Sequence, residues 1–155
     1  MTASRKLRIG VLFGGRSGEH EVSLRSAQSV MAALDPARYE VVPIGITKDG
    51  RWVAGDAAGA LAPGGRAVTL LPEPAAEAGA ELLALDRTGD ASSLSVIAEL
   101  DAVLPVLHGT YGEDGTVQGL LELAGLPYVG AGVVGSAVGM DKAIFKHVME
   151  ANGLP

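Results

Sequence analysis

The sequence has no cysteine among its 155 residues and few aromatic side chains. Without cysteine, disulfide frameworks, thiolate nucleophiles and cysteine-based zinc sites are excluded, and a reducing compartment is permitted. Aromatic residues make up 4% of the chain, too few for a surface that stacks single-stranded nucleic acid. Basic residues are outnumbered, with 12 Lys and Arg against 18 Asp and Glu, and the net charge of -6 repels a phosphate backbone. We therefore expect no nucleic-acid partner.

Long apolar runs and several ligand-binding motifs are also missing. The first apolar stretch ends at Gly14 and is too short for a signal-peptide core or a membrane span, so we expect a cytoplasmic protein without a membrane partner. The sequence contains neither the G-x-x-x-x-G-K-[ST] P-loop nor a full G-x-G-x-x-G dinucleotide motif. It also lacks H-E-x-x-H and H-x-x-x-H, so a metal site built from His20, His108 and Glu113 has no support from spacing.

What the chain does contain is glycine, which accounts for 22 of the 155 residues. That is about twice the ordinary usage, and no G-X-Y period explains it, so the glycines belong to turns and close backbone approaches. A hydrophobic fraction of 48% and a length typical of one domain indicate a folded globular unit. Function is therefore expected in the glycine-rich loops.

The apolar residues follow the order of an α/β domain. The run at 7–13 is short, aliphatic and closed by two glycines, as is typical of a buried parallel strand. Later segments alternate between such runs and the i, i+3, i+4, i+7 spacing of amphipathic helices. The predicted strands lie at 7–13, 40–46 and 102–107, with shorter strands at 67–71, 81–85 and 128–129, and an edge hairpin has its turn at 48–51 and continues into 52–53. Three predicted helices bury one apolar side each. The buried residues are Ala27, Val30, Met31 and Leu34 in the first helix, Val117, Leu120, Leu121 and Ala124 in the second, and Ile144, Phe145, Val148 and Met149 in the third. The predicted fold class is α/β, an open, mainly parallel sheet with helices on both faces.

The first candidate loop reads GGRSGEHE at 14–21, between the first strand and the first helix. Ligands of open α/β sheets bind at the carboxyl ends of the strands, where glycines admit a ligand to the backbone and a helix N-terminus offers free N–H groups. This position predicts ligand binding at Gly14 and Gly15. The alternative is a tight strand-to-helix turn in which Glu19 and Glu21 only complement the helix dipole.

The second candidate loop reads HGTYGEDGTVQG at 108–119. A histidine at a strand end, four glycines and an acidic pair at a helix start have no common packing rationale. The imidazole of His108 can pair with a substrate carboxylate, while Glu113 and Asp114 are expected to hold the loop and cap the helix. A purely structural histidine is the alternative.

A third candidate is Lys142, in the first turn of the last predicted helix. A lysine there opposes the helix dipole, which indicates a nearby anion such as a nucleotide phosphate. The alternative is an ordinary exposed lysine.

Four stretches together resemble the amino-terminal part of the D-alanine-D-alanine ligases. They occur in the family's order and spacing, and the segment 108–119 matches the family's signature. Only the segment at about 55–100 gives no information about this resemblance. The stretches are GGRSGEHEVSLRSA at 14–27, YEVVPIGITKDGRW at 39–52, HGTYGEDGTVQGLLELAGLPYVG at 108–130 and SAVGMDKAIFKHVMEANGLP at 136–155.

The resemblance implies an ATP-grasp ligase of the bacterial cytoplasm, commonly dimeric, that makes the D-alanine dipeptide of peptidoglycan precursors with ATP and Mg²⁺ as cofactors. In that family ATP phosphorylates one D-alanine, and the amine of a second attacks the acyl phosphate. By position, Glu19 resembles the acid that binds the ammonium of the first D-alanine. His108, followed by Gly109, resembles the residue near its carboxylate and the acyl phosphate. Lys142 resembles the lysine that contacts ATP phosphate.

The resemblance also implies a Rossmann-like pre-ATP-grasp domain at 1–135 and the start of the ATP-grasp domain at 136–155. The family's lid over ATP, its magnesium-binding acids and its oxyanion arginine lie further downstream. We therefore expect this chain to be a fragment that is inactive alone, with ATP and Mg²⁺ bound mainly by residues absent from it.

Two other functions remain open at this point. One is a non-catalytic small-molecule-binding α/β domain. The other is a related ligase that joins D-alanine to D-lactate or D-serine, since the residues that select the second substrate lie mostly downstream.

Overall fold

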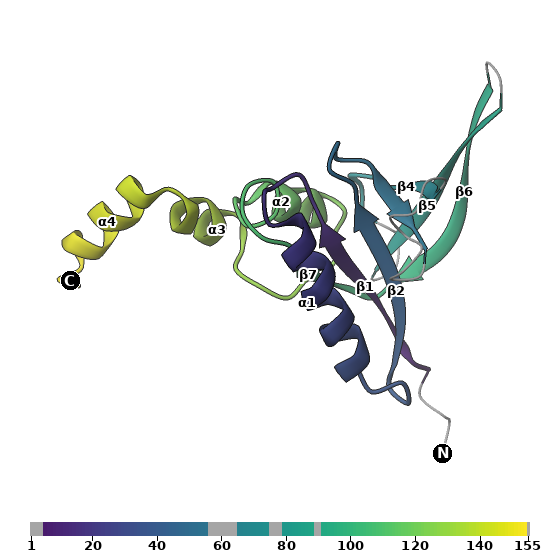
Figure 1. Cartoon of the computed structure of the whole chain (residues 1–155), viewed down its shortest axis with the longest axis horizontal. Helices are drawn as coiled ribbons and strands as arrows, with labels where there is room; N and C mark the ends of the chain where they lie inside the picture. The colour runs from purple at the N-terminus through teal and green to yellow at the C-terminus, as the bar shows by residue number, and fades with distance from the viewer. Residues whose placement is uncertain (1–4, 56–64, 75–78, 89–90, 155) are drawn as a thin grey trace.

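The computed structural model describes residues 5–55, 65–74, 79–88 and 91–154, which form one sheet with helices beside it (Figure 1). The elements, in chain order, are β1 (Leu7–Gly14), α1 (His20–Ala33), β2 (Tyr39–Ile46), β3 (Trp52–Ala54), β4 (Arg66–Leu70), β5 (Ala80–Thr88), β6 (Ala91–Leu100), β7 (Ala102–Val106), α2 (Thr116–Leu123), α3 (Val133–Met140) and α4 (Lys142–Ala151).

The sheet has the strand order β6-β5-β4-β3-β2-β1-β7. β1 pairs in parallel with both β2 and β7, and the remaining neighbours pair antiparallel. The open α/β sheet is confirmed, although its parallel part is the three-strand end β2-β1-β7 and the whole sheet is mixed. The antiparallel pairing of β2 with β3 follows from chain length, because the link at 47–51 is too short for a crossover helix.

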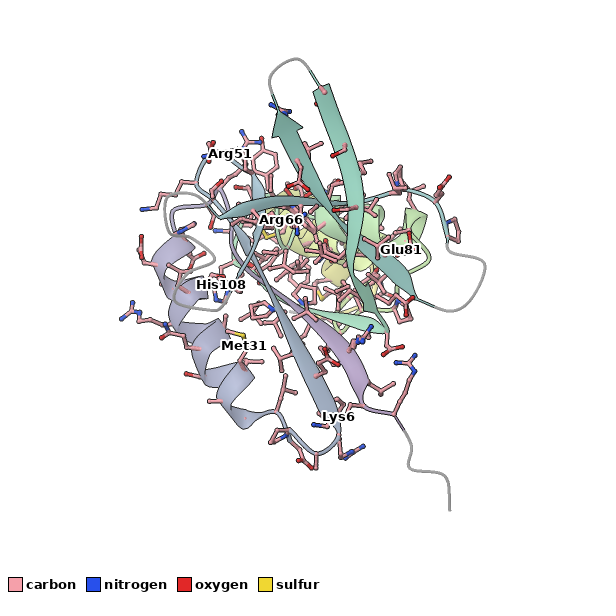
Figure 2. All side chains as sticks on the ribbon, turned by 90° about the vertical axis from the view of Figure 1, so that its right-hand side faces the viewer. Lys6, Met31, Arg51, Arg66, Glu81 and His108 are labelled. Atoms are coloured by element: carbon pink, nitrogen blue, oxygen red, sulfur yellow. The ribbon has the colours of Figure 1, made fainter. Side chains whose placement is uncertain are left out.

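Helices cover both faces of the sheet at its parallel end, as predicted. Along β1, Val11 and Phe13 face α1 and pack with Ala27, whereas Leu12 belongs to the opposite cluster, which includes Leu121 of α2. This division follows from the two-residue repeat of a strand. Met31 lies on the side of α1 that faces the sheet (Figure 2).

Two predictions need correction, and two elements were not predicted. The strand at 128–129 is only a single bridge between Tyr128 and Val103. The sequence analysis missed β6, because this strand is largely exposed and lacks the pattern of a buried strand. It also missed α3, because two glycines and one serine interrupt the apolar residues of this helix. The apolar side of α4 is not buried against any described residue, so its predicted packing is wrong for this part of the protein.

Candidate functional site at the ends of two parallel strands

The topology places the carboxyl ends of β1 and β7 side by side, and we call the space between the loops that leave them the crevice. From β1 the chain passes through α1 to β2 on one side, while β7 lies on the other side of β1. In open α/β sheets this reversal of strand order is where ligands bind. Both predicted glycine-rich loops leave the sheet here, because one follows β1 and the other follows β7.

The first loop makes a tight turn that requires glycine. Gly14 and Gly15 have φ angles of +88° and +96°, and a Cβ on Gly14 would lie 2.3 Å from the carbonyl oxygen of Ile46. The Gly15 N–H donates to that same oxygen at 2.8 Å, and the Gly15 carbonyl accepts from Nδ1 of the buried His20 at 2.7 Å. His20 therefore holds the turn from the protein interior.

The two loops meet at Glu19 and Gly109. A Cβ on Gly109 would lie 3.2 Å from Cβ of Ser17 and 3.6 Å from the carboxylate Oε2 of Glu19. Glu19 is exposed and stands at the N-cap of α1 without accepting a capping hydrogen bond. Its carboxylate is thus free to face the crevice beside the second loop.

Glu113 fixes the backbone directly after His108. Its carboxylate accepts the N–H of Gly109 at 2.6 Å, and its own N–H donates to the Gly109 carbonyl at 2.9 Å. Gly109 has a φ of +70°, which favours glycine. The predicted loop-holding role of Glu113 is confirmed by these contacts.

The residue His108 is half-buried, and its ring nitrogen Nε2 is buried. Its Nε2 has no hydrogen-bond partner among the described residues. Because a buried polar atom without a partner is costly, this nitrogen marks a place where a ligand group or a further part of the protein would be stabilised.

Asp114 organises the rest of the second loop. Its carboxylate accepts the N–H of Tyr111 at 2.7 Å and both the N–H and the hydroxyl of Thr116, at 3.1 and 2.7 Å. Partial burial raises its pKa, but the hydrogen bonds from Thr116 and Tyr111 outweigh burial and hold the pKa below its ordinary value of 3.8. The N-cap of α2 is Gly115, at a φ of +92°, so the capping position predicted at Asp114 is one residue too early.

Sequence reasoning missed a contact that ties the first loop to the second. The guanidinium of Arg16 lies 4.3 Å from the centre of the Tyr111 ring, within cation–π distance. Tyr111 has a φ of +61°, the one positive value at a non-glycine residue in the described part of the chain. A Cβ on Gly50 would lie 2.9 Å from Cδ of Arg16, so this glycine leaves room for the arginine.

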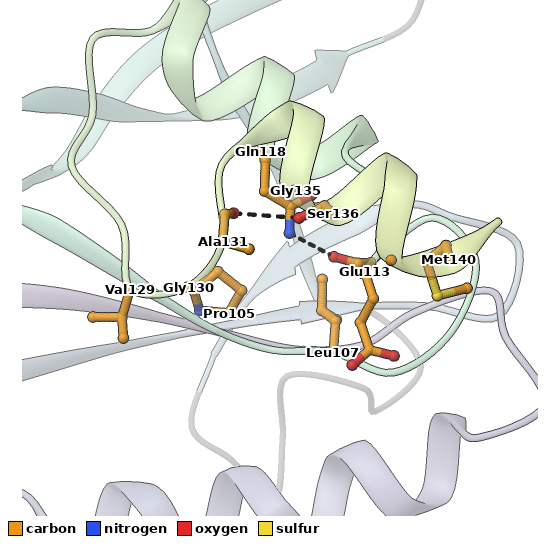
Figure 3. Close-up of a pocket in the computed structure, with 12 residues that line it drawn as sticks. Pro105, Leu107, Glu113, Gln118, Val129, Gly130, Ala131, Gly135, Ser136 and Met140 are labelled. Atoms are coloured by element: carbon orange, nitrogen blue, oxygen red, sulfur yellow. Dashed lines mark hydrogen bonds between the residues drawn. The ribbon is translucent and has the colours of Figure 1, made fainter. Parts of the chain in front are cut away.

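Behind the second loop lies a cavity of about 360 Å³, bounded by β7, α2, the segment at 129–131 and α3 (Figure 3). Gln118 lines it, and its side-chain amide donates to the carbonyl of Gly112 at 2.9 Å. Ser136 of α3 also lines it and donates to the carbonyl of Ala131 at 3.2 Å. Gln118 is part of the glycine-rich segment, but its packing role had no signal in the sequence.

Lys142 is not brought to the crevice. It begins α4, which Asp141 caps by accepting from the N–H groups of Ala143 and Ile144, both at 3.0 Å. Its side chain is exposed, and α4 extends away from the sheet beyond α3 (Figure 1). The structure thus groups Glu19, His108 and Gly109 and leaves Lys142 apart.

The described residues contain no group of three or more His, Asp or Glu side chains placed to hold a metal ion. Across the same ranges, no helix is both long and apolar enough to cross a membrane.

Comparison with known proteins identifies the family. Residues 8–131 match the family model described as the D-ala D-ala ligase N-terminus. A D-alanine--D-alanine ligase of Mycobacterium avium is 54% identical over 100% of this chain and 44% of its own length. That of Natranaerobius thermophilus is 51% identical over 97% of this chain and 40% of its own length.

Solved structures agree with this assignment. The D-alanine-D-alanine ligase from Coxiella burnetii superposes with a TM-score of 0.75 at 38% identity, over 98% of this chain and 43% of that one. The VanG D-Ala:D-Ser ligase from Enterococcus faecalis gives the same TM-score at 33% identity, over 96% and 43%. The chain spans less than half the length of the relatives it matches. It belongs to the family of D-alanine-D-alanine ligase N-terminal domains.

Proposed function

We propose that this chain is the N-terminal part of an ATP-dependent D-alanine-D-alanine ligase and supplies half of the binding site for the first D-alanine. The observation that carries the proposal is the meeting of Glu19 with the His108–Gly109 segment at the switch point of the sheet. Two relatives named D-alanine--D-alanine ligase, which are 51% and 54% identical in sequence to this chain, support the dipeptide as the product.

The charges of the crevice suit a small zwitterion. The Glu19 carboxylate binds the ammonium of the first D-alanine, and His108 lies toward its carboxylate and the acyl phosphate formed from it. Gly14, Gly15 and Gly109 have positive φ angles that favour glycine, and their tight turns bring both loops together at this edge of the sheet. His108 stabilises the charge that develops at the activated carboxyl group.

ATP and Mg²⁺ do not find a complete site among the described residues. Lys142 offers a single cation at the start of α4, and no metal-binding cluster accompanies it in the described ranges. We place these cofactors mainly on the part of the longer relatives that this chain does not match, with Lys142 contacting ATP phosphate. The 155-residue chain alone is then inactive, and D-alanine-dependent phosphate release by it would refute this.

The segment from residue 136 onward begins the ATP-grasp domain in this proposal, and residues 1–135 form the substrate-binding domain. The exposed apolar side of α4 supports a packing partner outside the described residues. The complete protein works in the cytoplasm, as a homodimer, in the synthesis of peptidoglycan precursors.

The test is dipeptide formation by the complete protein and its Glu19→Ala variant. We expect the variant to need a higher D-alanine concentration at the first site, with the ATP requirement unchanged. Glu21→Ala is the matched control, because Glu21 is exposed on the same helix start and pairs with Lys48 at 2.9 Å. Equal kinetics for Glu19→Ala and wild type would remove Glu19 from the site, and a product made only with D-serine or D-lactate would identify the related ligases.

A further inference from the structure

Ser23 uses its hydroxyl in an unusual way for a serine inside a helix. It lies on α1 one turn after Glu19 and is fully buried. Serines within helices commonly bond to a carbonyl of their own helix, as the exposed Ser29 does at 3.3 Å. The Ser23 hydroxyl instead accepts the N–H of Gly14 at 2.8 Å and donates to the carbonyl of Val106.

These two partners lie where β1 and β7 separate. The parallel register between the strands ends at the pair Phe13 and Val106, after which each strand enters its own loop. Where two paired strands diverge, their buried backbone groups lose their partners in the neighbouring strand, and leaving such groups unpaired costs free energy. A hydroxyl both accepts and donates, so Ser23 satisfies one group from each strand and joins the two strand ends.

The same residue is connected to both halves of the crevice. The N–H of Ser23 donates to the carbonyl of Glu19 at 3.0 Å, and Gly14 begins the turn that leads to Glu19. Val106 lies two residues before His108. We infer that Ser23 is a positioning residue, whose hydroxyl sets the separation of Glu19 and His108 and thereby the fit of the first D-alanine.

The role in substrate binding rests on the proposed function, whereas the link between the strand ends does not. Removing the hydroxyl leaves the Gly14 N–H and the Val106 carbonyl without their shared partner, and the two loops are then free to move apart. Since small misplacements of substrate-positioning groups cost up to about a hundredfold in rate, we expect kcat/KM for the first D-alanine to fall roughly tenfold to a hundredfold.

The first experiment needs no activity. Backbone amide NMR spectra of the 155-residue chain are compared for wild type, Ser23→Ala and the control Ser29→Ala. The expected result is that Ser23→Ala shifts amides in both loops, around Gly14 and from Val106 to Gly109, and leaves β4 to β6 unchanged. Shifts confined to α1 would overturn the inference.

If Ser23→Ala fails to fold, two further measurements decide. Ser23→Cys keeps the volume with a much weaker hydrogen-bonding group, and it is expected to shift the same two loops. In the wild type, the Gly14 amide is expected to exchange slowly with solvent, in keeping with a buried bond to Ser23. A rapidly exchanging Gly14 amide would contradict the link itself.

The second experiment uses the complete protein and separates KM from kcat. We expect Ser23→Ala to raise the KM for the first D-alanine, with the ATP KM within about twofold of wild type and Ser29→Ala unchanged. A kcat/KM for the first D-alanine equal to that of wild type, or a rise in the ATP KM as large as the rise in the D-alanine KM, would mean a merely structural residue and overturn the positioning role. If the wild-type complete protein makes no dipeptide, the proposed function fails, while the NMR result still decides whether Ser23 joins the two loops.

Discussion

α2 and α4 carry the same kind of apolar spacing, yet only α2 is buried. Val117 and Leu121 of α2 are 7% and 0% exposed, whereas Ile144 and Phe145 of α4 are 49% and 42% exposed. α2 lies on the sheet and shares a core with β1, while α4 contributes no residue to the described core clusters. The comparison teaches that an amphipathic pattern predicts an apolar helix face but not what covers it.

The largest expected effect separates the two helices by stability. In the 155-residue chain, Leu121→Ala should lower the free energy of unfolding by about 2–5 kcal/mol, because it leaves a cavity in a closed core. Phe145→Ala on α4 should change it by less than about 0.5 kcal/mol. Denaturant unfolding measures both, with the exposed Leu123→Ala as the control on α2. A Phe145→Ala loss as large as that of Leu121→Ala would show that α4 is packed after all.

The second prediction compares histidines at the crevice and on α4. In the complete protein, His108→Ala should lower turnover by a factor of roughly 30 to 1000, equivalent to about 2–4 kcal/mol of transition-state stabilisation. His147→Ala, on the exposed α4, is the matched control and should leave turnover unchanged. Steady-state dipeptide formation is the measurement. If His108→Ala instead abolishes soluble protein, the histidine is structural.

The third prediction concerns pH and the second loop. Hydrogen bonds keep the pKa of Asp114 below its ordinary value of 3.8, so its stabilisation is complete above that value and is lost as pH falls through the lower folded-state pKa. At neutral pH, Asp114→Asn should cost about 1 kcal/mol of unfolding free energy. This difference from wild type should shrink as pH falls below about 4. Unfolding curves across pH measure it, and Glu150→Gln on α4 is expected to show no such dependence. A difference that does not vary with pH would contradict the ionic role.

The smallest expected effect is the stacking of Arg16 on Tyr111 between the loops. A double-mutant cycle with Arg16→Ala and Tyr111→Ala should give a coupling energy of about 0.5 kcal/mol. Arg38 and Tyr39, which are adjacent in the sequence, serve as a reference pair. The guanidinium carbon of Arg38 lies 5.3 Å from the centre of the Tyr39 ring, so this pair should couple more weakly. Zero coupling for Arg16 and Tyr111 would show that this contact does not hold the two loops together.

Much of the parallel half was predictable because its signals are local. The β1 run, its glycine pair and the spacing of α1 all reflect burial on one sheet, and the predicted strand and helix are confirmed. The antiparallel half was less predictable. β6 is exposed along most of its length, so neither alternation nor an apolar run marked it.

Part of the candidate site was also predictable from the sequence, and part was not. Positions at strand ends, such as Glu19 and His108, follow from topology once the strands are identified. The contacts that join the loops were not predictable, because Ser23 lies in a helix and meets Val106 across 83 positions of sequence. Lys142 was predicted to bind a nucleotide phosphate from its place in the first turn of a helix and from the resemblance, whereas the structure places it at the start of α4.

The most direct test of the central claim is an NMR titration of the 155-residue chain with D-alanine, with L-alanine as the control. The account predicts weak binding, with concentration-dependent shifts at Glu19, His108 and Gly109 for D-alanine and no shifts on α4. Shifts that avoid both loops, or that are the same for L-alanine, would contradict the claim that the ends of β1 and β7 form half of the first D-alanine site.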